Sequence, residues 1–187
     1  MLSQGWSQAN NAAVSKMGLP ITRTAAVRRK TTRSKQKILI IEDDKSMHAL
    51  YKAVLENPKI SFRSAYDGAI GLTMAETIEP DLILLDVDLP GVTGFFICKY
   101  LKANPLTASI PVILISGLSS ADDILCGMKV KASDYVTKPI EENDLRSRVE
   151  DALNAAEIME KIANASAMLP HSRTTPTAFR TIPNGGQ

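Results

Sequence analysis

Three short runs of consecutive apolar residues constrain the fold of this chain more than any other feature. They cover residues 38–41, 82–85 and 112–115, and a polar side chain directly follows each of them. A strand that is apolar at every position is buried on both faces, which is typical of a parallel sheet covered by helices on two sides. The sequence therefore predicts at least three buried, parallel strands.

Two weaker strand patterns and five helical patterns complete the predicted order of elements. Ile60 and Phe62 alternate with polar residues, as expected of a less buried edge strand, and 135–137 is a short final strand. Helices are predicted after each strand: on the apolar positions 47, 50, 51, 54 and 55, after an Asp67 N-cap, over 95–102, over 119–128, and from about residue 141. Five strands, each followed by a helix, predict an α/β fold with an open parallel sheet.

Charge divides the 187 residues into three parts. Residues 1–36 carry seven Lys or Arg and no acid, and residues 161–187 carry three and no acid. All 20 acidic residues therefore lie in 37–160, against 12 basic ones, a net charge of −8. We expect a disordered basic arm at 1–35, one folded domain at 36–160, and at 161–187 the end of the last helix followed by a disordered tail. The arm is interpreted as a solvated spacer, a segment that binds nucleic acid or an acidic partner, or an organellar targeting signal.

Several classes of protein are excluded by the composition. The longest apolar runs are four residues, whereas a membrane-spanning helix needs about 20. No apolar block follows the first basic residues, so we expect no secretory signal. Cys98 and Cys126 have no metal-binding or redox spacing, and reduced thiols favour a cytoplasmic protein. His48 is expected at the surface or partly buried.

Polar residues follow four of the predicted strands and should meet at one edge of the sheet. Glu42, Asp43 and Asp44 follow the first strand, and Asp86 and Asp88 follow the third. Ser116 and Lys138 follow the fourth and fifth strands. Ligands of open α/β sheets bind outside the carboxyl ends of the strands, so this group of side chains is the candidate site.

The chemistry of this group points to a divalent cation and a phosphoryl group. Neighbouring carboxylates repel one another, and a hard cation such as Mg²⁺ relieves the repulsion. An ammonium and a hydroxyl can hold further phosphoryl oxygens, which suggests phosphoryl transfer to a carboxylate. Taken singly, Asp43 or Asp44 is more often a helix N-cap, Ser116 a turn residue and Lys138 a solvated loop residue. The coincidence at four strand ends favours the site.

These motifs resemble the receiver domain of two-component response regulators. Residues 38–44 resemble its first strand and acidic pair, 86–94 its phospho-acceptor loop, 116–117 its hydroxyl-plus-small pair, and 134–139 the end of its fifth strand. The spacings between Asp43, Asp86, Ser116 and Lys138 are 43, 30 and 22 residues, similar to the family's. The resemblance implies a flavodoxin-like (βα)5 fold with strand order 2-1-3-4-5.

The resemblance also implies a role for each site residue. Asp86 is the residue that is phosphorylated, and Mg²⁺ is bound by Asp43 and Asp86, by Glu42 through water and by the backbone carbonyl of Asp88. Lys138 pairs with Asp86 and then with the phosphate. Ser116 and Tyr135 form the switch that remodels the face of the fourth helix, fifth strand and fifth helix.

Two local features of the family pattern can be checked in a structure. Lys138-Pro139 is a cis peptide in this family. Lys131 stands where the family usually has Gly, a residue that adopts a positive φ without steric cost. A lysine with a positive φ at this position costs on the order of 1 kcal/mol.

The sequence leaves three functions open. The leading one is a stand-alone receiver, not an enzyme, that takes its phosphoryl group from a histidine kinase or histidine-phosphotransfer protein and passes the signal to a downstream protein. A homodimer is left open, no membrane is expected, and nucleic acid is expected only through the basic arm. The alternatives are a haloacid-dehalogenase-type phosphohydrolase, suggested by the Asp-x-Asp at 86–88, and a scaffold that works without phosphorylation.

Overall fold

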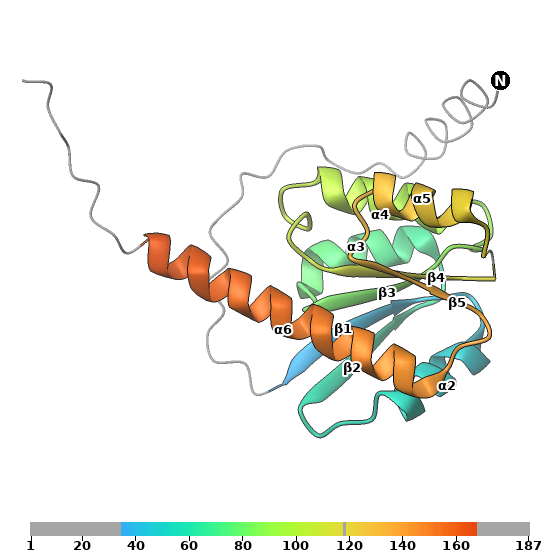
Figure 1. Cartoon of the computed structure of the whole chain (residues 1–187), viewed down its shortest axis with the longest axis horizontal. Coiled ribbons are helices and arrows are strands. Elements are labelled where there is room, and N and C mark those ends of the chain that lie inside the picture. The colour runs from blue at the N-terminus through green and yellow to red at the C-terminus, as the bar shows by residue number, and fades with distance from the viewer. Residues whose placement is uncertain (1–34, 118, 168–187) are drawn as a thin grey trace, which may run out of the picture.

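Five parallel strands form a single sheet in the order β2-β1-β3-β4-β5. The computed structural model describes residues 35–117 and 119–167 of the chain (Figure 1). The strands are β1 (Gln36–Ile41), β2 (Ile60–Ala65), β3 (Leu82–Asp86), β4 (Val112–Ser116) and β5 (Asp134–Thr137). This strand number and order confirm the predicted flavodoxin-like architecture.

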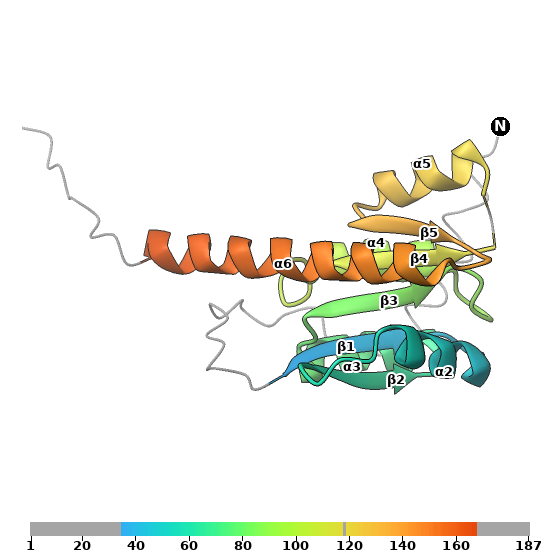
Figure 2. The same ribbon diagram turned by 60° about the horizontal axis from the view of Figure 1, so that its bottom comes forward.

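The helices cover both faces of the sheet. They are α2 (Lys45–Val54), α3 (Gly68–Ile78), α4 (Gly94–Ala103), α5 (Ala121–Lys129) and α6 (Glu142–Ala167). Helices α2 and α6 lie on one face, and α3, α4 and α5 lie on the other (Figures 1 and 2). The sheet is therefore the middle layer of three, and its central strands β3 and β4 are buried on both faces.

Burial of the central strands accounts for their continuous apolar sequences. Every residue of β3 and β4 is buried. Alternate side chains of these strands enter two different clusters: Ile83 and Leu114 face α3 and α4, whereas Leu84 and Ile113 face α2 and α6. Burying one such side chain contributes about 1.5–3 kcal/mol, so the strands are the main source of folding free energy.

The edge strand and the helix N-cap agree with the sequence predictions. β2 pairs with β1, and Ile60 and Phe62 are half-buried. Asp67 caps α3, because its carboxylate accepts hydrogen bonds from the backbone N–H groups of Ala69 (2.7 Å) and Ile70 (3.2 Å). Lys131 has φ of 61° and Lys138-Pro139 is cis, as the family pattern implies.

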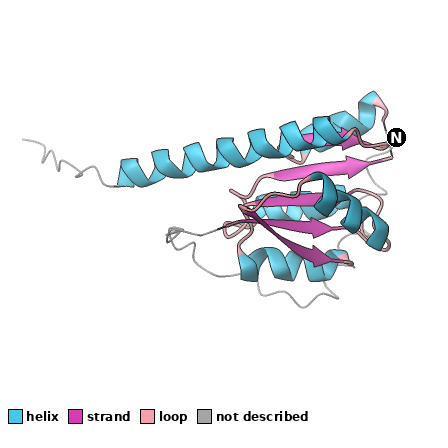
Figure 3. Ribbon diagram, turned by 90° about the horizontal axis from the view of Figure 1, so that it is seen from below, coloured by secondary structure: helices cyan, strands magenta, loops and turns pink. Residues whose placement is uncertain are grey.

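Helix α6 extends well beyond the sheet. Leu145, Val149 and Leu153 are buried against the sheet, and the helix then continues over residues 154–167. The three ribbon views agree that this second half passes the amino ends of the strands (Figures 1–3). The predicted arm at 1–34 and the tail from 168 onward lie outside the described residues. Among the helices that the structure describes, none has the length and apolarity to cross a membrane.

Gly94 offers a test of how closely the loop after β3 is packed. A Cβ added there would overlap the carbonyl oxygen of Asp86 and lie 2.8 Å from Cα of Val87. These are backbone atoms, which move only with the strand, so Gly94→Ala should lower the free energy of unfolding by about 1–3 kcal/mol. Urea denaturation measures this change.

Gly117→Ala is the matched control at the same edge of the sheet. A Cβ at Gly117 meets one atom within 4 Å, an oxygen of Asp88 at 3.9 Å. Its unfolding free energy should stay within about 1 kcal/mol of wild type. Equal losses in the two variants would contradict the packing described for Gly94.

Candidate functional site

The carboxyl ends of four strands bring the predicted polar residues together at one end of the sheet. The parallel register aligns Ile41 with Leu85, so Glu42 follows β1 at the level where Asp86 ends β3. Asp86 is the last residue of its strand, and Ser116 is the last of β4. The backbone N–H of Lys138 donates to the carbonyl of Ser116 (2.7 Å), which continues the alignment across β5.

One lysine bridges two buried carboxylates at this edge. Nζ of Lys138 lies 2.7 Å from Oδ1 of Asp86 and 3.2 Å from Oε2 of Glu42. Asp86 and Glu42 are only 3% and 2% exposed. Acids are almost never buried unless they are paired, so the lysine is the group that makes this arrangement tolerable.

Further hydrogen bonds hold the two carboxylates in place. The backbone N–H of Asp88 donates to Oδ2 of Asp86 (2.9 Å), and the hydroxyl of Tyr51 donates to Oε2 of Glu42 (3.1 Å). His48 contacts the backbone of Glu42 through Nε2 (2.8 Å to the carbonyl oxygen). The fixed geometry means that neither carboxylate can turn away from the lysine without losing a second partner.

The site holds more negative charge than its lysine compensates. Burial raises the pKa of Asp86, and the hydrogen bond and charge of Lys138 offset this only in part. Burial and the charge of Asp86 likewise raise the pKa of Glu42. For Lys138, burial lowers the pKa, but Asp86 and Glu42 together outweigh it and raise the pKa. The folded site thus favours the protonated form of all three side chains relative to the free amino acids.

A third carboxylate makes the cluster suitable for a divalent cation. One oxygen each from Glu42, Asp43 and Asp86 can be chosen so that all three lie within 4.8 Å of one another. Asp43 is exposed and opens the cluster to solvent. Three carboxylates facing one position, with one side open for water, are a donor set that fits Mg²⁺. Asp44, by contrast, is the N-cap of α2 and accepts from Ser46, so it serves the helix.

The remaining predicted residues lie around this cluster. Ser116 is buried, and its hydroxyl is 3.4 Å from Oδ2 of Asp88, which also accepts from the backbone N–H of Gly117 (3.4 Å). Tyr135 is half-buried, and its ring lies parallel to Phe95 with centroids 6.3 Å apart. Burial raises the pKa of Tyr135, against a smaller opposite effect of a hydrogen bond with Ser116. Asp88, Ser116 and Tyr135 are thus connected by successive hydrogen bonds.

Two residues near the site were not assigned to it from the sequence. His48 is 2% exposed and therefore fully buried, so the expectation of a surface or partly buried histidine is wrong. The ring of Tyr66, 4.4 Å away between centroids, helps to bury it. Tyr51 lies on the apolar face of α2 and reaches Glu42 with its hydroxyl. A tyrosine on an otherwise apolar helix face was the available signal, since a buried hydroxyl needs a partner.

Comparison with known proteins gives a consistent result. Residues 38–150 match a family described as "Response regulator receiver domain". The chain is 34% identical over 148 residues to the "DNA-binding dual master transcriptional regulator RpaA" of a Synechocystis strain, covering 78% of this chain and 61% of that protein. It is 36% identical over 131 residues to "Response regulator PleD" of Caulobacter vibrioides, covering 70% and 29%. The chain therefore spans less than two thirds of the length of these relatives.

Solved structures match the same region. A CheY-like response regulator receiver domain protein from Methanospirillum hungatei superposes with a TM-score of 0.61 at 26% identity. The match covers 67% of this chain and 99% of that one. The residues of the site described above all lie within residues 38–150, which match the family.

The raised pKa of Asp86 predicts how stability depends on pH without metal. A carboxyl group with a higher pKa in the folded than in the unfolded chain binds protons more tightly when folded. The free energy of unfolding therefore falls as the pH rises from the normal aspartate pKa to the raised one, and stays low above it. In EDTA at pH 7, Asp86→Asn should raise stability by about 1 kcal/mol, a few degrees in Tm.

Asp88→Asn is the control, because this neighbouring acid is exposed. Melting curves of the three proteins between pH 3.5 and 8, conditions that bracket the aspartate pKa of about 3.9, should show the Asp86→Asn gain only at the higher pH values. A gain that is the same at every pH, or one shared by Asp88→Asn, contradicts the burial of an ionised Asp86.

Proposed function

Because this chain belongs to the receiver-domain family of response regulators, we propose that it accepts a phosphoryl group on Asp86 in a two-component system. The observation that carries the proposal is the 2.7 Å ion pair between Lys138 and Asp86 beside two further acids. A nucleophilic carboxylate next to an ammonium, at the carboxyl end of a strand, is suited to phosphoryl transfer.

The chemistry assigned to Asp86 is an in-line displacement at phosphorus. A carboxylate oxygen of Asp86 forms the new O–P bond while the N–P bond to a phosphohistidine donor breaks, and the imidazole nitrogen keeps the electron pair. Lys138 holds Asp86 in place before transfer and then pairs with a phosphoryl oxygen. The backbone N–H of Asp88, 2.9 Å from Oδ2, orients the carboxylate.

Glu42, Asp43 and Asp86 are the residues we assign to Mg²⁺, with Asp88 contributing its backbone carbonyl. When bound, the ion neutralises negative charge on the transferring phosphoryl group. The raised pKa values of Asp86 and Glu42 support the assignment, because burial and neighbouring carboxylates disfavour their ionised forms and a bound cation stabilises those forms.

We assign the switch to Ser116 and Tyr135. A phosphoryl group on Asp86 offers the Ser116 hydroxyl a stronger acceptor than Asp88, its neighbour at 3.4 Å. Tyr135 is hydrogen-bonded to Ser116 and half-buried beside Phe95, so movement of Ser116 changes its surroundings. The ring lies next to α5, whose Ile124, Leu125 and Met128 are 40%, 48% and 69% exposed and are suited to a protein partner.

The proposed module comprises residues 36–160, with the arm and tail outside it. Its partners are a histidine kinase or phosphotransfer protein as donor and a downstream protein as target. We propose a cytoplasmic signalling protein whose only chemistry is its own phosphorylation and dephosphorylation. DNA binding, which the name of the Synechocystis relative includes, is not carried over, because 39% of that relative lies outside the match.

Phosphorylation by a small molecule tests the assignment of Asp86. With Mg²⁺ and acetyl phosphate or phosphoramidate, the wild-type chain should gain one hydroxylamine-sensitive phosphoryl group, detected by intact mass spectrometry. Asp86→Asn should gain none, and Lys138→Ala should retain much less than wild type. Asp88→Asn changes a neighbouring acid and should still be modified.

Two results would reject the proposal. One is equal modification of Asp86→Asn and wild type. The other is repeated turnover of a phosphomonoester, which would indicate a phosphohydrolase of the haloacid-dehalogenase type.

A further inference from the structure

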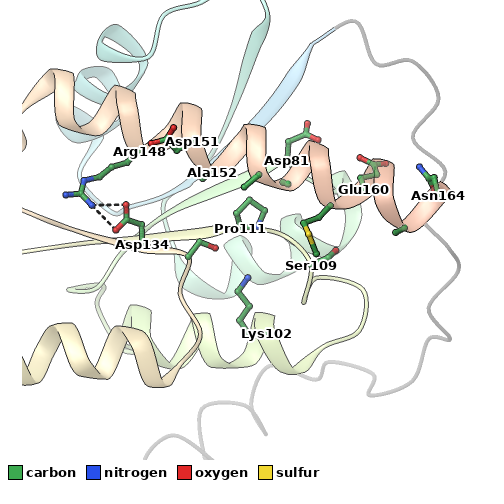
Figure 4. Close-up of a pocket in the computed structure, with 15 residues that line it drawn as sticks. Asp81, Lys102, Ser109, Pro111, Asp134, Arg148, Asp151, Ala152, Glu160 and Asn164 are labelled. Atoms are coloured by element: carbon green, nitrogen blue, oxygen red, sulfur yellow. Dashed lines mark hydrogen bonds and ion pairs between the residues drawn. The ribbon is translucent and has the colours of Figure 1, made fainter. Parts of the chain in front are cut away.

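A groove lies at the amino ends of the strands, at the other end of the sheet from the proposed phosphorylation site. It has a volume of about 710 Å³ and runs between α6 and the amino ends of β3, β4 and β5 (Figure 4). Asp81 and Pro111 line it from the segments before β3 and β4, and Asp134 lines it from the first residue of β5. None of these residues belongs to the site described above, so the groove needs a separate explanation.

The helical wall of the groove is apolar and open to solvent. It is formed by Ala152, Ala155, Ala156, Met159 and Ala163. Met159 is 66% exposed. A helical segment as short as residues 154–167 is marginally stable in water by itself, and a second segment packed on its apolar side would stabilise it. The small alanine side chains leave room for a backbone to approach closely.

The rim of the groove is acidic. Four acids line it, Asp81, Asp134, Asp151 and Glu160, against the two cations Lys102 and Arg148.

Both cations are already held by the domain itself. Nζ of Lys102 donates to the carbonyls of Ala108 (3.3 Å) and Ile110 (2.6 Å). The guanidinium of Arg148 bonds to Asp134 and Asp144 at 2.8–2.9 Å. Asp134 is thus paired within the groove, but the four acids and two cations of the lining leave a net charge of −2, which favours a positively charged occupant.

A basic segment of this same chain precedes β1, and β1 begins beside the groove. Residues 21–34 include Arg23, Arg28, Arg29, Lys30 and Arg33, no acid, and the apolar stretch Ala25-Ala26-Val27. The chain enters β1 against the groove wall, because the backbone N–H of Lys37 donates to Asp81 (2.7 Å).

The tether is long enough to reach along the groove. At about 3.3 Å per extended residue, six residues span about 20 Å. That equals the roughly 20 Å from Asp151 to Asn164 along α6 at 1.5 Å per residue. Tethering gives the segment a local concentration in the millimolar range, so that even weak contacts are populated.

We propose that residues 21–34 dock intramolecularly in this groove. Their basic side chains pair with the acidic rim, and Ala25-Ala26-Val27 packs on the apolar wall at Met159. Docking covers the extended half of α6, and it withholds the basic residues from nucleic acid and from acidic proteins. The proposal is independent of the phosphorylation of Asp86.

Paramagnetic broadening in the full chain tests this placement. A nitroxide is attached to Ala25→Cys in a Cys126→Ser background, where Cys98 stays unlabelled at neutral pH because burial raises its pKa to about 11. At low salt, amide signals of residues 152–164 should lose more than half of their intensity. Signals of α3, on the other face of the sheet, serve as the internal reference.

Charge reversal separates docking in the groove from general attraction. Asp151→Lys with Glu160→Lys should restore the signals of 152–164, as should about 0.5 M salt, which shortens the Debye length to roughly 4 Å. The control pair, Glu150→Lys with Glu56→Lys, makes the same charge change at exposed positions outside the groove lining and should leave the broadening intact.

Three results would overturn the proposal. The first is the absence of broadening at 152–164, and the second is broadening that persists in the Asp151→Lys, Glu160→Lys variant. The third is broadening seen only when a nitroxide-labelled chain is mixed with a second, isotope-labelled copy. The last result would make the occupant another molecule of this protein.

Discussion

The account depends on one interaction, the sharing of the Lys138 ammonium between the buried carboxylates of Asp86 and Glu42. Burial is the main reason that the pKa values of both acids are raised, and repulsion from a neighbouring carboxylate adds to it. The site is thus built at a cost to stability, and a cation or a new partner for Lys138 relieves that cost. Groups held in this way respond strongly to a change of charge, which is what a phosphorylation switch requires.

The rest of the fold makes this unfavourable arrangement possible. The fully buried strands β3 and β4 contribute enough hydrophobic free energy to hold Asp86 and Ser116 at their carboxyl ends. Parallel pairing places all the strand ends at one edge, so residues 96 positions apart, Glu42 and Lys138, meet directly. The opposite edge has a different character, since it carries the groove beneath α6 and the entry of the basic segment. The proposed phosphorylation site and the proposed docking of residues 21–34 therefore occupy separate ends of the sheet.

The sequence predicted the sheet and most of the site because both follow from local patterns. Apolar runs identified the buried strands, and the polar residues after them identified Asp86, Ser116 and Lys138. Contacts that depend on tertiary packing were not predictable in this way. The burial of His48 results from Glu42 and Tyr66, which come from other elements, and the same holds for the hydroxyl of Tyr51. The groove likewise depends on where α6 lies relative to the start of β4. The hydrophobic periodicity of the sequence does not predict this placement.

The most direct test of the shared lysine and its excess charge is the melting temperature as a function of Mg²⁺ concentration. Binding to the folded chain alone stabilises it by RT ln(1 + [L]/Kd), about 2.7 kcal/mol at a hundredfold excess over Kd. The account predicts that Tm of the wild-type protein rises with Mg²⁺ along this curve, and that Asp86→Asn responds much less. No rise in the wild-type protein, or the same rise in both proteins, would contradict it.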